Sequence, residues 1–178
     1  GLDPGAAAVV NLDDPMAVAQ FALAPVARRR TFGTAKSADV RVLSSEPFDA
    51  TPEDEARAGA DEWQRARFSV DGRPLEVAMP YPGDHNEMNA AAAIAAATAI
   101  TSGTMELEDV ARGLLAASRV AGRLNIERLG PYFLVDDCYN ANAGSMLVAI
   151  ATLAKRVARR GGRLVALLGE MRELGHFS

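Results

Sequence analysis

Short apolar runs alternate with helical segments along this sequence, and that alternation restricts the possible folds more than any other feature. The apolar run 7–10 leads into Asn11-Leu12-Asp13-Asp14-Pro15, the pattern of a buried strand followed by a loop and a helix. Asp14 is expected to cap that helix, with Pro15 at its first position. The elements expected next are a helix at 16–24 and short strands at 29–32 and 39–45. This order is typical of an α/β fold.

The middle of the chain predicts a hairpin and two helices. Asp71-Gly72 separates the runs 67–70 and 75–79, and this dipeptide is a strong signal for a two-residue turn between antiparallel strands. Two helices should follow, the first dense in alanine and the second amphipathic, at residues 86–101 and 106–118. The acidic stretch 46–63 shows little apolar periodicity, so we expect a surface loop or a short exposed helix there.

A second sheet is expected to begin near residue 123, with a hairpin that turns at Gly130-Pro131. Its two strands are expected at 124–129 and 132–135. Helix 145–160 and the apolar run 163–168 would then complete a strand–helix–strand crossover, the connection that builds parallel sheets.

Composition limits the class of protein. Hydrophobic residues make up 49% and charged residues 24% of the chain, as in soluble globular domains, and the net charge of -4 gives no overall attraction to nucleic acid. The only cysteine, Cys138, permits no intramolecular disulfide, and we interpret it as a structural thiol in a reducing cytoplasm. The longest apolar stretch, 90–100, is too short to cross a bilayer, which takes about 20 residues. Residues 1–8 do not resemble a signal peptide, so we expect a cytoplasmic protein.

Three clusters of polar and turn-forming residues stand where elements end, which is where open α/β sheets bind ligands. The first cluster opens the Ala-dense helix and contains His85, Asn86 and Asn89. Backbone N–H groups at a helix start favour anions, and Asn86 and Asn89 share one face of the first turn. An amide offers the donor and the acceptor that the edge of an adenine requires. The alternative is that His85 or Asn86 caps the helix while Asn89 bonds to nearby backbone.

The second cluster is Gly122-Arg123, in which the guanidinium suits phosphate through its planar, bidentate donors. The alternative is a surface charge without a ligand. The third cluster is the stretch 135–146, where the adjacent carboxylates Asp136-Asp137 follow an apolar strand and suit ribose hydroxyls or a cation. The alternative there is a capped turn, with Asn142 or Ser145 starting the next helix.

Taken in order, five stretches of this chain resemble the Mur ligase family. The H-N-x-x-N and Gly-Arg elements are similar to those of the whole family, including folylpolyglutamate synthetase. The D-D-x-Y-N-A-N stretch with G-x-M-x-E-L-G resembles more specifically the branch that joins D-alanyl-D-alanine to UDP-N-acetylmuramoyl-tripeptide, although Ala143 stands where a proline is common. The five stretches are residues 11–14, 83–90, 122–123, 136–146 and 169–175.

The resemblance implies an α/β fold in two parts. Residues 1–121 would be the later part of the ATP-binding central domain, and residues 122–178 the first hairpin and βαβ unit of a Rossmann-like C-terminal domain. In this family the phosphate loop, the magnesium ligands and the nucleotide-sugar domain lie upstream of the residues that match Gly1, and this sequence contains no G-x-x-x-x-G-K-[ST] loop. We therefore expect an incomplete chain that has no ligase activity alone.

The resemblance also implies a reaction. ATP, with Mg²⁺, phosphorylates the terminal carboxylate of the tripeptide, and the amine of D-alanyl-D-alanine attacks the acyl phosphate. Positioning and electrostatics dominate such phosphoryl transfer. When the roles are carried over by position, Asn86 and Asn89 would contact adenine, and His85 would line the nucleotide site. Arg123 would reach the phosphates, and Asp137 would bind the ribose hydroxyls. The acceptor side would be formed by Tyr139, Asn140 and Asn142. Arg123 and His85 are the expected catalytic residues.

Two other functions stay open at this point. A folylpolyglutamate synthetase-like ligase shares the general motifs, but the Tyr-Asn-Ala-Asn turn at 139–142 argues against it. A catalytically silent nucleotide-binding or scaffold module would keep the central fold without a phosphate loop. A G-K-[ST] loop in the gene upstream of Gly1 would indicate a ligase, and its absence from a complete gene would favour the silent module. We expect a monomer that binds neither nucleic acid nor membranes.

Overall fold

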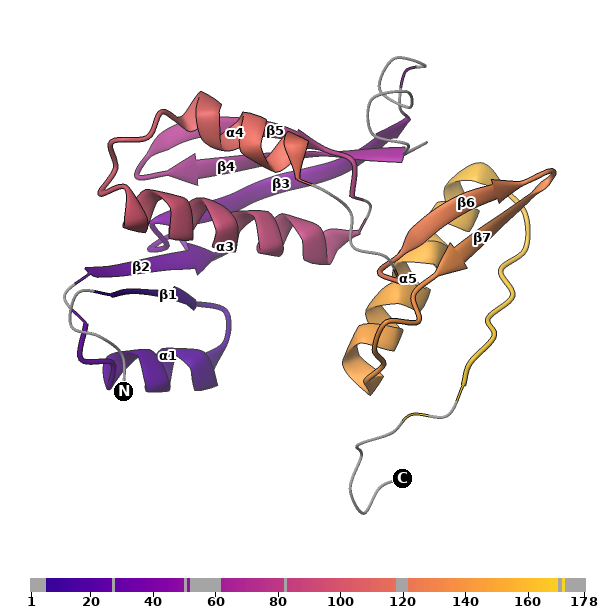
Figure 1. Ribbon diagram of the computed structural model, residues 1–178, viewed down its shortest axis with the longest axis horizontal. Helices are drawn as coiled ribbons and strands as arrows, with labels where there is room; N and C mark the ends of the chain where they lie inside the picture. Colours follow the sequence, from indigo (N-terminus) through magenta and orange to yellow (C-terminus); the bar gives the residue numbers. More distant parts are fainter. Residues whose placement is uncertain are drawn as a thin grey trace. The chain divides into compact units, whose positions relative to one another are not determined.

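The structure, a computed structural model, describes residues 6–26, 28–49, 51, 62–81, 83–117, 122–169 and 171. The chain divides into two compact units, Gly1–Ala117 and Ser118–Ser178. Figure 1 shows the helices and strands of each unit, coloured along the sequence. Helices and strands occur together in both units, so the expected α/β class is confirmed.

The first unit contains a five-stranded mixed sheet in the order β1-β2-β3-β4-β5. Neighbouring strands are parallel from β1 to β3 and antiparallel from β3 to β5. Asp71 and Gly72 form the turn between β4 and β5 with φ angles of 50° and 80°, so the expected two-residue hairpin is confirmed. The strands are β1 (Ala7–Asn11), β2 (Arg28–Gly33), β3 (Val40–Asp49), β4 (Glu62–Val70) and β5 (Arg73–Met79).

The pairing of β3 with β4 extends further than the sequence predicts. We expected a loop or an exposed helix over 46–63, but the two strands continue into this stretch from both sides. Phe48 pairs with Trp63 across the strands, with the ring centroids 6.3 Å apart, and Trp63 is buried. Such cross-strand aromatic pairs stabilise a sheet, and local periodicity does not reveal them. Residues 52–61 lie outside the described part of the chain.

Helix α1 (Pro15–Ala22) begins where the sequence predicts and ends slightly earlier than residue 24. Asp14 Oδ1 accepts hydrogen bonds from the backbone N–H groups of Met16 and Ala17, at 2.9 and 3.2 Å. The expected cap is therefore confirmed, and it satisfies two of the N–H groups that a helix start leaves without partners.

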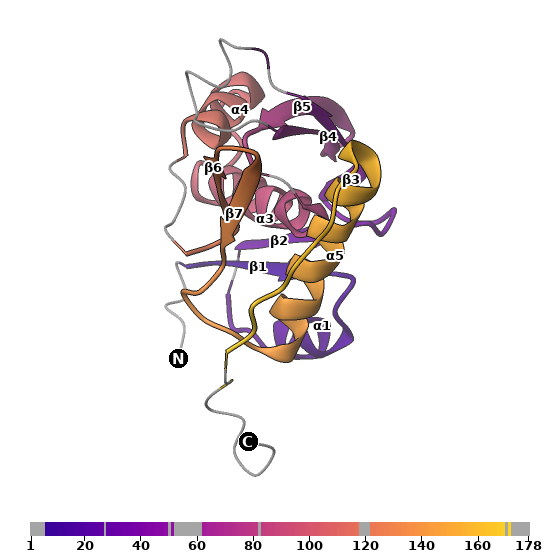
Figure 2. The same cartoon turned by 90° about the vertical axis from the view of Figure 1, so that its right-hand side faces the viewer.

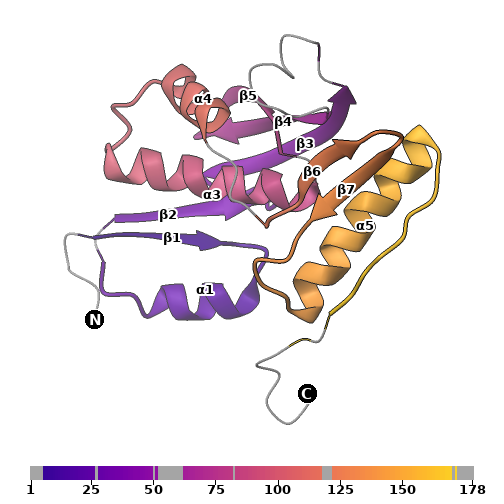
Figure 3. The ribbon, with the colours of Figure 1, turned by 45° about the vertical axis from the view of Figure 1, so that its right-hand side comes forward.

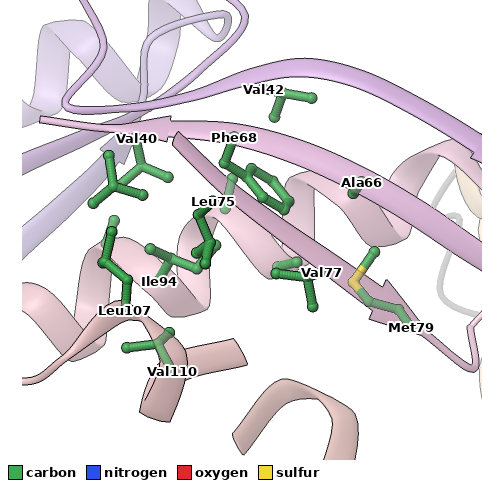
Figure 4. Packing of buried hydrophobic residues seen from close by; sticks show 14 residues of the cluster. Val40, Val42, Ala66, Phe68, Leu75, Val77, Met79, Ile94, Leu107 and Val110 are labelled. Carbon is green, nitrogen blue, oxygen red and sulfur yellow. The ribbon is translucent and has the colours of Figure 1, made fainter. Parts of the chain in front are cut away.

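Helices α3 (Asp84–Ile100) and α4 (Leu107–Ala116) enclose the core of the first unit. α3 lies along β1, β2 and β3, and α4 lies against β5. Figure 4 shows Ile94 of α3 beside Leu75 of β5, with Leu107 and Val110 of α4 near them. The core consists of the buried side chains Val40, Val42, Ala66, Phe68, Val70, Leu75, Val77, Met79, Ala90, Ala91, Ile94, Ala95, Leu107 and Val110. Three of the four residues from α3 are alanines, which lets this helix approach the strands closely.

The second unit contains the strands β6 (Asn125–Leu129) and β7 (Tyr132–Asp136) and the helix α5 (Ala143–Arg160). β6 and β7 pair antiparallel, so the second expected hairpin is confirmed. Arg156 of α5 is buried and lies over the ring of Phe133, with its guanidinium carbon 5.1 Å from the ring centroid. This contact places α5 on the face of the hairpin that carries Phe133.

The segment after α5 differs from the expectation. The sequence predicts a strand over 163–168, but no residue of 163–169 belongs to a strand, and Figure 2 shows the yellow trace after α5 without an arrow. Leu167 is 93% exposed. A parallel strand needs a paired neighbour and a covered face, and a two-stranded parallel sheet would bury little surface. The expected βαβ unit is therefore not closed, and the described part of the second unit consists of a hairpin with one helix.

Two further expectations, the motif at 169–175 and the lack of a membrane-crossing segment, can be compared with the structure only over the described residues. Of the stretch 169–175, only Gly169 and Met171 are described. In the described part of the chain, no helix combines the length and the hydropathy that a membrane crossing requires.

Candidate functional site

The first cluster opens α3, and its start is marked by a glycine. Gly83 is the N-cap residue, with a φ of 111°, a conformation that residues with a side chain rarely adopt. Among the described residues, no side-chain hydrogen bond caps this helix. The alternative in which His85 or Asn86 caps α3 therefore does not hold. Both side chains lie in the first turn and are half-buried.

Asn86 and Asn89 are neighbours on one face of α3, as their spacing predicts. Asn89 Nδ2 donates a hydrogen bond to Asn86 Oδ1 at 3.3 Å, and Asn89 is exposed. The two amides form one polar edge near the start of α3. Because an amide carries both a donor and an acceptor, this edge suits a flat base with both kinds of group.

The position of α3 in the sheet supports a ligand site. Figures 1 and 3 show that α3 begins at the end of the sheet where β1 and β2 finish. In open α/β sheets, ligands bind outside the carboxyl ends of parallel strands. The amides of Asn86 and Asn89 therefore lie at the edge of the first unit where a ligand is expected.

Asp13 ties together the loops that follow β1 and β2 at this edge. Its carboxylate accepts hydrogen bonds from the Thr34 N–H at 2.8 Å and from Thr34 Oγ1 at 3.0 Å, while the Asp13 N–H donates to Asn11 Oδ1 at 2.9 Å. Gly33 allows this approach, because a Cβ there would lie 3.0 Å from the Asp13 carboxylate oxygens. Sequence reasoning missed Gly33 and Thr34, whose only signal is a Gly-Thr pair directly after a strand.

The second and third clusters form one structure in the second unit. The Tyr139 N–H donates to the Gly122 carbonyl at 3.1 Å, and the Leu124 N–H donates to Asp137 Oδ1 at 3.0 Å. Gly122 has a φ of 71°, and a Cβ on it would lie 3.0 Å from Tyr139 N. Glycine is therefore required at this close approach. Arg123, which is exposed, lies over the Tyr139 ring at 4.8 Å from its guanidinium carbon to the ring centroid.

The carboxylates after β7 also shape the turn. Asp136 Oδ1 accepts a hydrogen bond from the Cys138 N–H at 3.2 Å. A hydrogen bond from the Cys138 thiol to Asp136, with the negative charge of that carboxylate, raises the pKa of the thiol. A raised pKa makes Cys138 a poor nucleophile at neutral pH. Among the described residues, no three His, Cys, Asp or Glu side chains are grouped so that they could hold a metal ion.

The turn ends in a helix cap. Asn142 Oδ1 accepts from the Ser145 N–H at 2.8 Å, and Ser145 Oγ accepts from the Asn142 N–H at 3.2 Å, a reciprocal capping box that starts α5. Asn140 Oδ1 accepts from the Ala141 N–H at 2.8 Å. The capped-turn alternative is therefore confirmed for Asn142, whose side-chain oxygen serves the helix.

The predicted site residues fall into two groups, one in each unit. The residues of α3 in the first unit are His85, Asn86 and Asn89. The residues of the second unit, around the turn between β7 and α5, are Arg123, Asp137, Tyr139, Asn140 and Asn142. In the first unit the structure joins Asn86 to Asn89, and in the second unit it joins Arg123 to Tyr139 and the backbone of Leu124 to Asp137.

Residues 1–97 match the family model of the Mur ligase middle domain. The chain belongs to the Mur ligase family. The matched residues include the sheet, α1 and nearly all of α3 with the amides of Asn86 and Asn89.

Two relatives and one solved structure make the likeness more specific. This Mur ligase chain is 40% identical over 105 residues to the UDP-N-acetylmuramoyl-tripeptide--D-alanyl-D-alanine ligase of Haemophilus influenzae, a match that covers 58% of the chain and 21% of that relative. The ligase of the same name from Mycobacterium bovis is 35% identical over 175 residues, covering 95% of the chain and 31% of the relative. A crystal structure of MurF from Acinetobacter baumannii matches with a TM-score of 0.72 and 28% identity, over 98% of this chain and 33% of that one. The chain thus spans a third or less of each of these proteins.

Proposed function

We propose that this Mur ligase chain is part of an ATP-dependent ligase that joins D-alanyl-D-alanine to UDP-N-acetylmuramoyl-tripeptide in peptidoglycan precursor synthesis. The observation that carries the proposal is the amide pair Asn86 and Asn89 at the carboxyl ends of β1 and β2. The names of the relatives from Haemophilus influenzae and Mycobacterium bovis support the choice of substrates. The activity belongs to the whole protein, of which this chain supplies nucleotide contacts.

The first unit would bind the base of ATP. Asn86 and Asn89 offer donors and acceptors along one edge, and this edge is complementary to the amino group and ring nitrogens of adenine. His85 precedes Asn86 in the same turn and would line the nucleotide. The loops fixed by Asp13 and Thr34 lie at the ends of β1 and β2 and would limit the movement of this edge.

The second unit would bind the ribose and a phosphate. Asp137 is held in place by the Leu124 N–H, and a carboxylate in a fixed position can accept hydrogen bonds from ribose hydroxyls. Arg123 carries a planar guanidinium, the side chain best suited to bidentate phosphate recognition. The charge of Arg123 would stabilise the negative charge that shifts onto the leaving ADP during phosphoryl transfer.

The chemical step has two parts. A carboxylate oxygen of the tripeptide attacks the γ-phosphorus of ATP, the bond to ADP breaks, and an acyl phosphate forms. The amine of D-alanyl-D-alanine then attacks the acyl carbon, phosphate leaves, and the nitrogen releases a proton, which completes the amide bond. The resemblance to the family assigns Asn140 and Asn142 to the acceptor side of this reaction. Holding the amine in line with the acyl carbon is the largest contribution that such residues can make.

The two units correspond in this proposal to two domains. Residues 1–121 are the later part of the ATP-binding central domain, and residues 122–178 begin a Rossmann-like C-terminal domain. ATP would act with Mg²⁺, but the described residues present no group of three ligands that fits a metal ion, so we assign no step to Mg²⁺ in this chain.

Calorimetric titration of the chain with ATP and with adenosine tests the adenine site. The wild-type chain should bind both ligands saturably, and Asn89→Ala should weaken both by about tenfold, the loss expected for one hydrogen bond. Gln20→Ala, which removes an exposed amide from α1, is the matched control and should bind as the wild type does. A wild-type chain that binds neither ligand, or equal binding by Asn89→Ala, would overturn the assignment.

A further inference from the structure

Arg123 lies over the ring of Tyr139, and no hydrogen bond found among the described residues uses its guanidinium donors. The guanidinium carbon is 4.8 Å from the ring centroid, and Tyr139 is 66% exposed. A ring that stacks on a guanidinium occupies one face of the plane, whereas the N–H donors all point outward within that plane. The contact with the ring restricts the rotamers of Arg123, and a guanidinium that stacks on the ring in this way keeps its in-plane donors for a phosphate.

The backbone on both sides of Arg123 is bonded to the turn that carries the ring. The Gly122 carbonyl accepts from the Tyr139 N–H at 3.1 Å, and the Leu124 N–H donates to Asp137 Oδ1 at 3.0 Å. Leu124 has a φ of 49°, an uncommon conformation for a residue with a side chain. Arg123 is thus anchored through both of its chain neighbours, and the ring fixes its side chain in addition.

We propose that Tyr139 is a positioning residue, whose ring holds the Arg123 guanidinium with its in-plane donors directed to a phosphate group of the bound nucleotide. This assignment rests on the proposed function and replaces the acceptor-side role expected for Tyr139 from the sequence. The ring performs this task and the hydroxyl does not. Phenylalanine at position 139 should therefore act as tyrosine does, and an aliphatic side chain should not.

Affinities for ATP and adenosine separate this role from a general structural one. Tyr139→Leu should weaken ATP binding by about three- to fivefold, the range of an exposed cation–π contact, and should leave adenosine binding unchanged. Tyr139→Phe should match the wild type for both ligands. Tyr132→Leu removes another exposed tyrosine from the same unit and is the matched control, with both affinities unchanged.

A double-mutant cycle shows whether Tyr139 acts through Arg123. Arg123→Ala should weaken ATP binding by at least as much as Tyr139→Leu does. Adding Tyr139→Leu to Arg123→Ala should then cause no further loss, because the guanidinium that the ring positions is gone. Additive losses would instead mean that Tyr139 contacts the ligand by itself, and they would overturn the proposal.

Side-chain NMR gives a readout that needs no ligand. The Arg123 Nε–H group should be ordered on the nanosecond timescale in the wild type and in Tyr139→Phe, and mobile in Tyr139→Leu. Equal mobility in all three proteins overturns the proposal even if ATP binds normally. A wild-type chain that binds no ATP removes the proposed function and this inference with it. If Tyr139→Leu binds ATP with unchanged affinity while Asn89→Ala binds it more weakly, only this inference is overturned and the proposed function stands.

Discussion

Arg30 on β2 and Asp71 in the turn between β4 and β5 form a two-point ion pair, with nitrogen–oxygen distances of 2.7 and 2.8 Å. Arg30 Nη2 also donates to Thr98 Oγ1 of α3 at 3.3 Å. One guanidinium therefore connects a parallel strand, the hairpin turn and the helix that carries the amide pair. The hydrogen bond to Asp71 raises the pKa of Arg30 and outweighs the opposing effect of burial, so this arginine stays charged.

Loss of the charge on Asp71 should destabilise the first unit. Asp71→Asn keeps a side chain that tolerates the φ of 50°, but it leaves a mostly buried guanidinium without its anion. We expect the free energy of unfolding to fall by about 1 kcal/mol in urea titrations. Glu76→Gln removes the exposed ion pairs of Glu76 with Arg65 and Arg67 and should cost about 0–1 kcal/mol. Equal losses in the two variants would contradict the role assigned to Arg30.

Alanine at Gly122 should disrupt the turn that links the second and third clusters. Its Cβ would lie 3.0 Å from Tyr139 N at a φ of 71°. Gly130→Ala is the matched control, because Gly130 has a φ of 62° and no atom within 4 Å of the added Cβ. Both variants carry the cost of a positive φ, about 1 kcal/mol, but only Gly122→Ala should also break the contact with Tyr139. The Tyr139 amide should then exchange with solvent faster in Gly122→Ala alone, and equal exchange in both would refute the close approach.

The reactivity of Cys138 should depend on Asp136. The carboxylate accepts the thiol hydrogen and raises the pKa of the thiol, so little thiolate is present near pH 8 in the wild type. Asp136→Asn removes the negative charge, which should lower the pKa of the thiol and move the pH profile of alkylation by iodoacetamide to lower pH. In 6 M urea the two proteins should react alike. A profile that is unchanged in folded Asp136→Asn would show that Asp136 does not control the thiol.

A lysine at Leu167 should leave the stability of the second unit unchanged. Leu167 is 93% exposed and its segment belongs to no strand, so no packing is lost and the effect should stay within about 0.5 kcal/mol. The charge should also reduce aggregation, measured by light scattering, since exposed apolar segments of low charge associate readily. A loss of stability above about 2 kcal/mol would indicate that 163–168 is packed in solution as the strand that the sequence predicts.

Local signals predict most of the first unit correctly. The Asp14 cap, the Asp71-Gly72 turn and the alanine-rich helix each depend on residues that are close in sequence, and all three are confirmed. The extension of β3 and β4 depends on the contact between Phe48 and Trp63, which only the tertiary fold brings together. The strand expected over 163–168 is not formed, because an apolar run becomes a strand only when a neighbouring strand pairs with it.

In the candidate site too, contacts between residues close in sequence could be predicted, and contacts made only by the tertiary fold could not. The contact between Asn86 and Asn89 follows from helical geometry, and the cap formed by Asn142 from its place before a helix. The stack of Arg123 on Tyr139 depends on backbone bonds between separate motifs, which no spacing rule reveals.

A hybrid enzyme tests the central claim most directly. This chain would replace the matched residues of the Mycobacterium bovis ligase, which align with 95% of it, and the ATP-dependent joining of D-alanyl-D-alanine to UDP-N-acetylmuramoyl-tripeptide would be measured by mass spectrometry. The account predicts that the hybrid forms the amide product and that alanine at both Asn86 and Asn89 reduces the rate by at least about tenfold. A folded hybrid that binds ATP as the parent does but forms no product would contradict it.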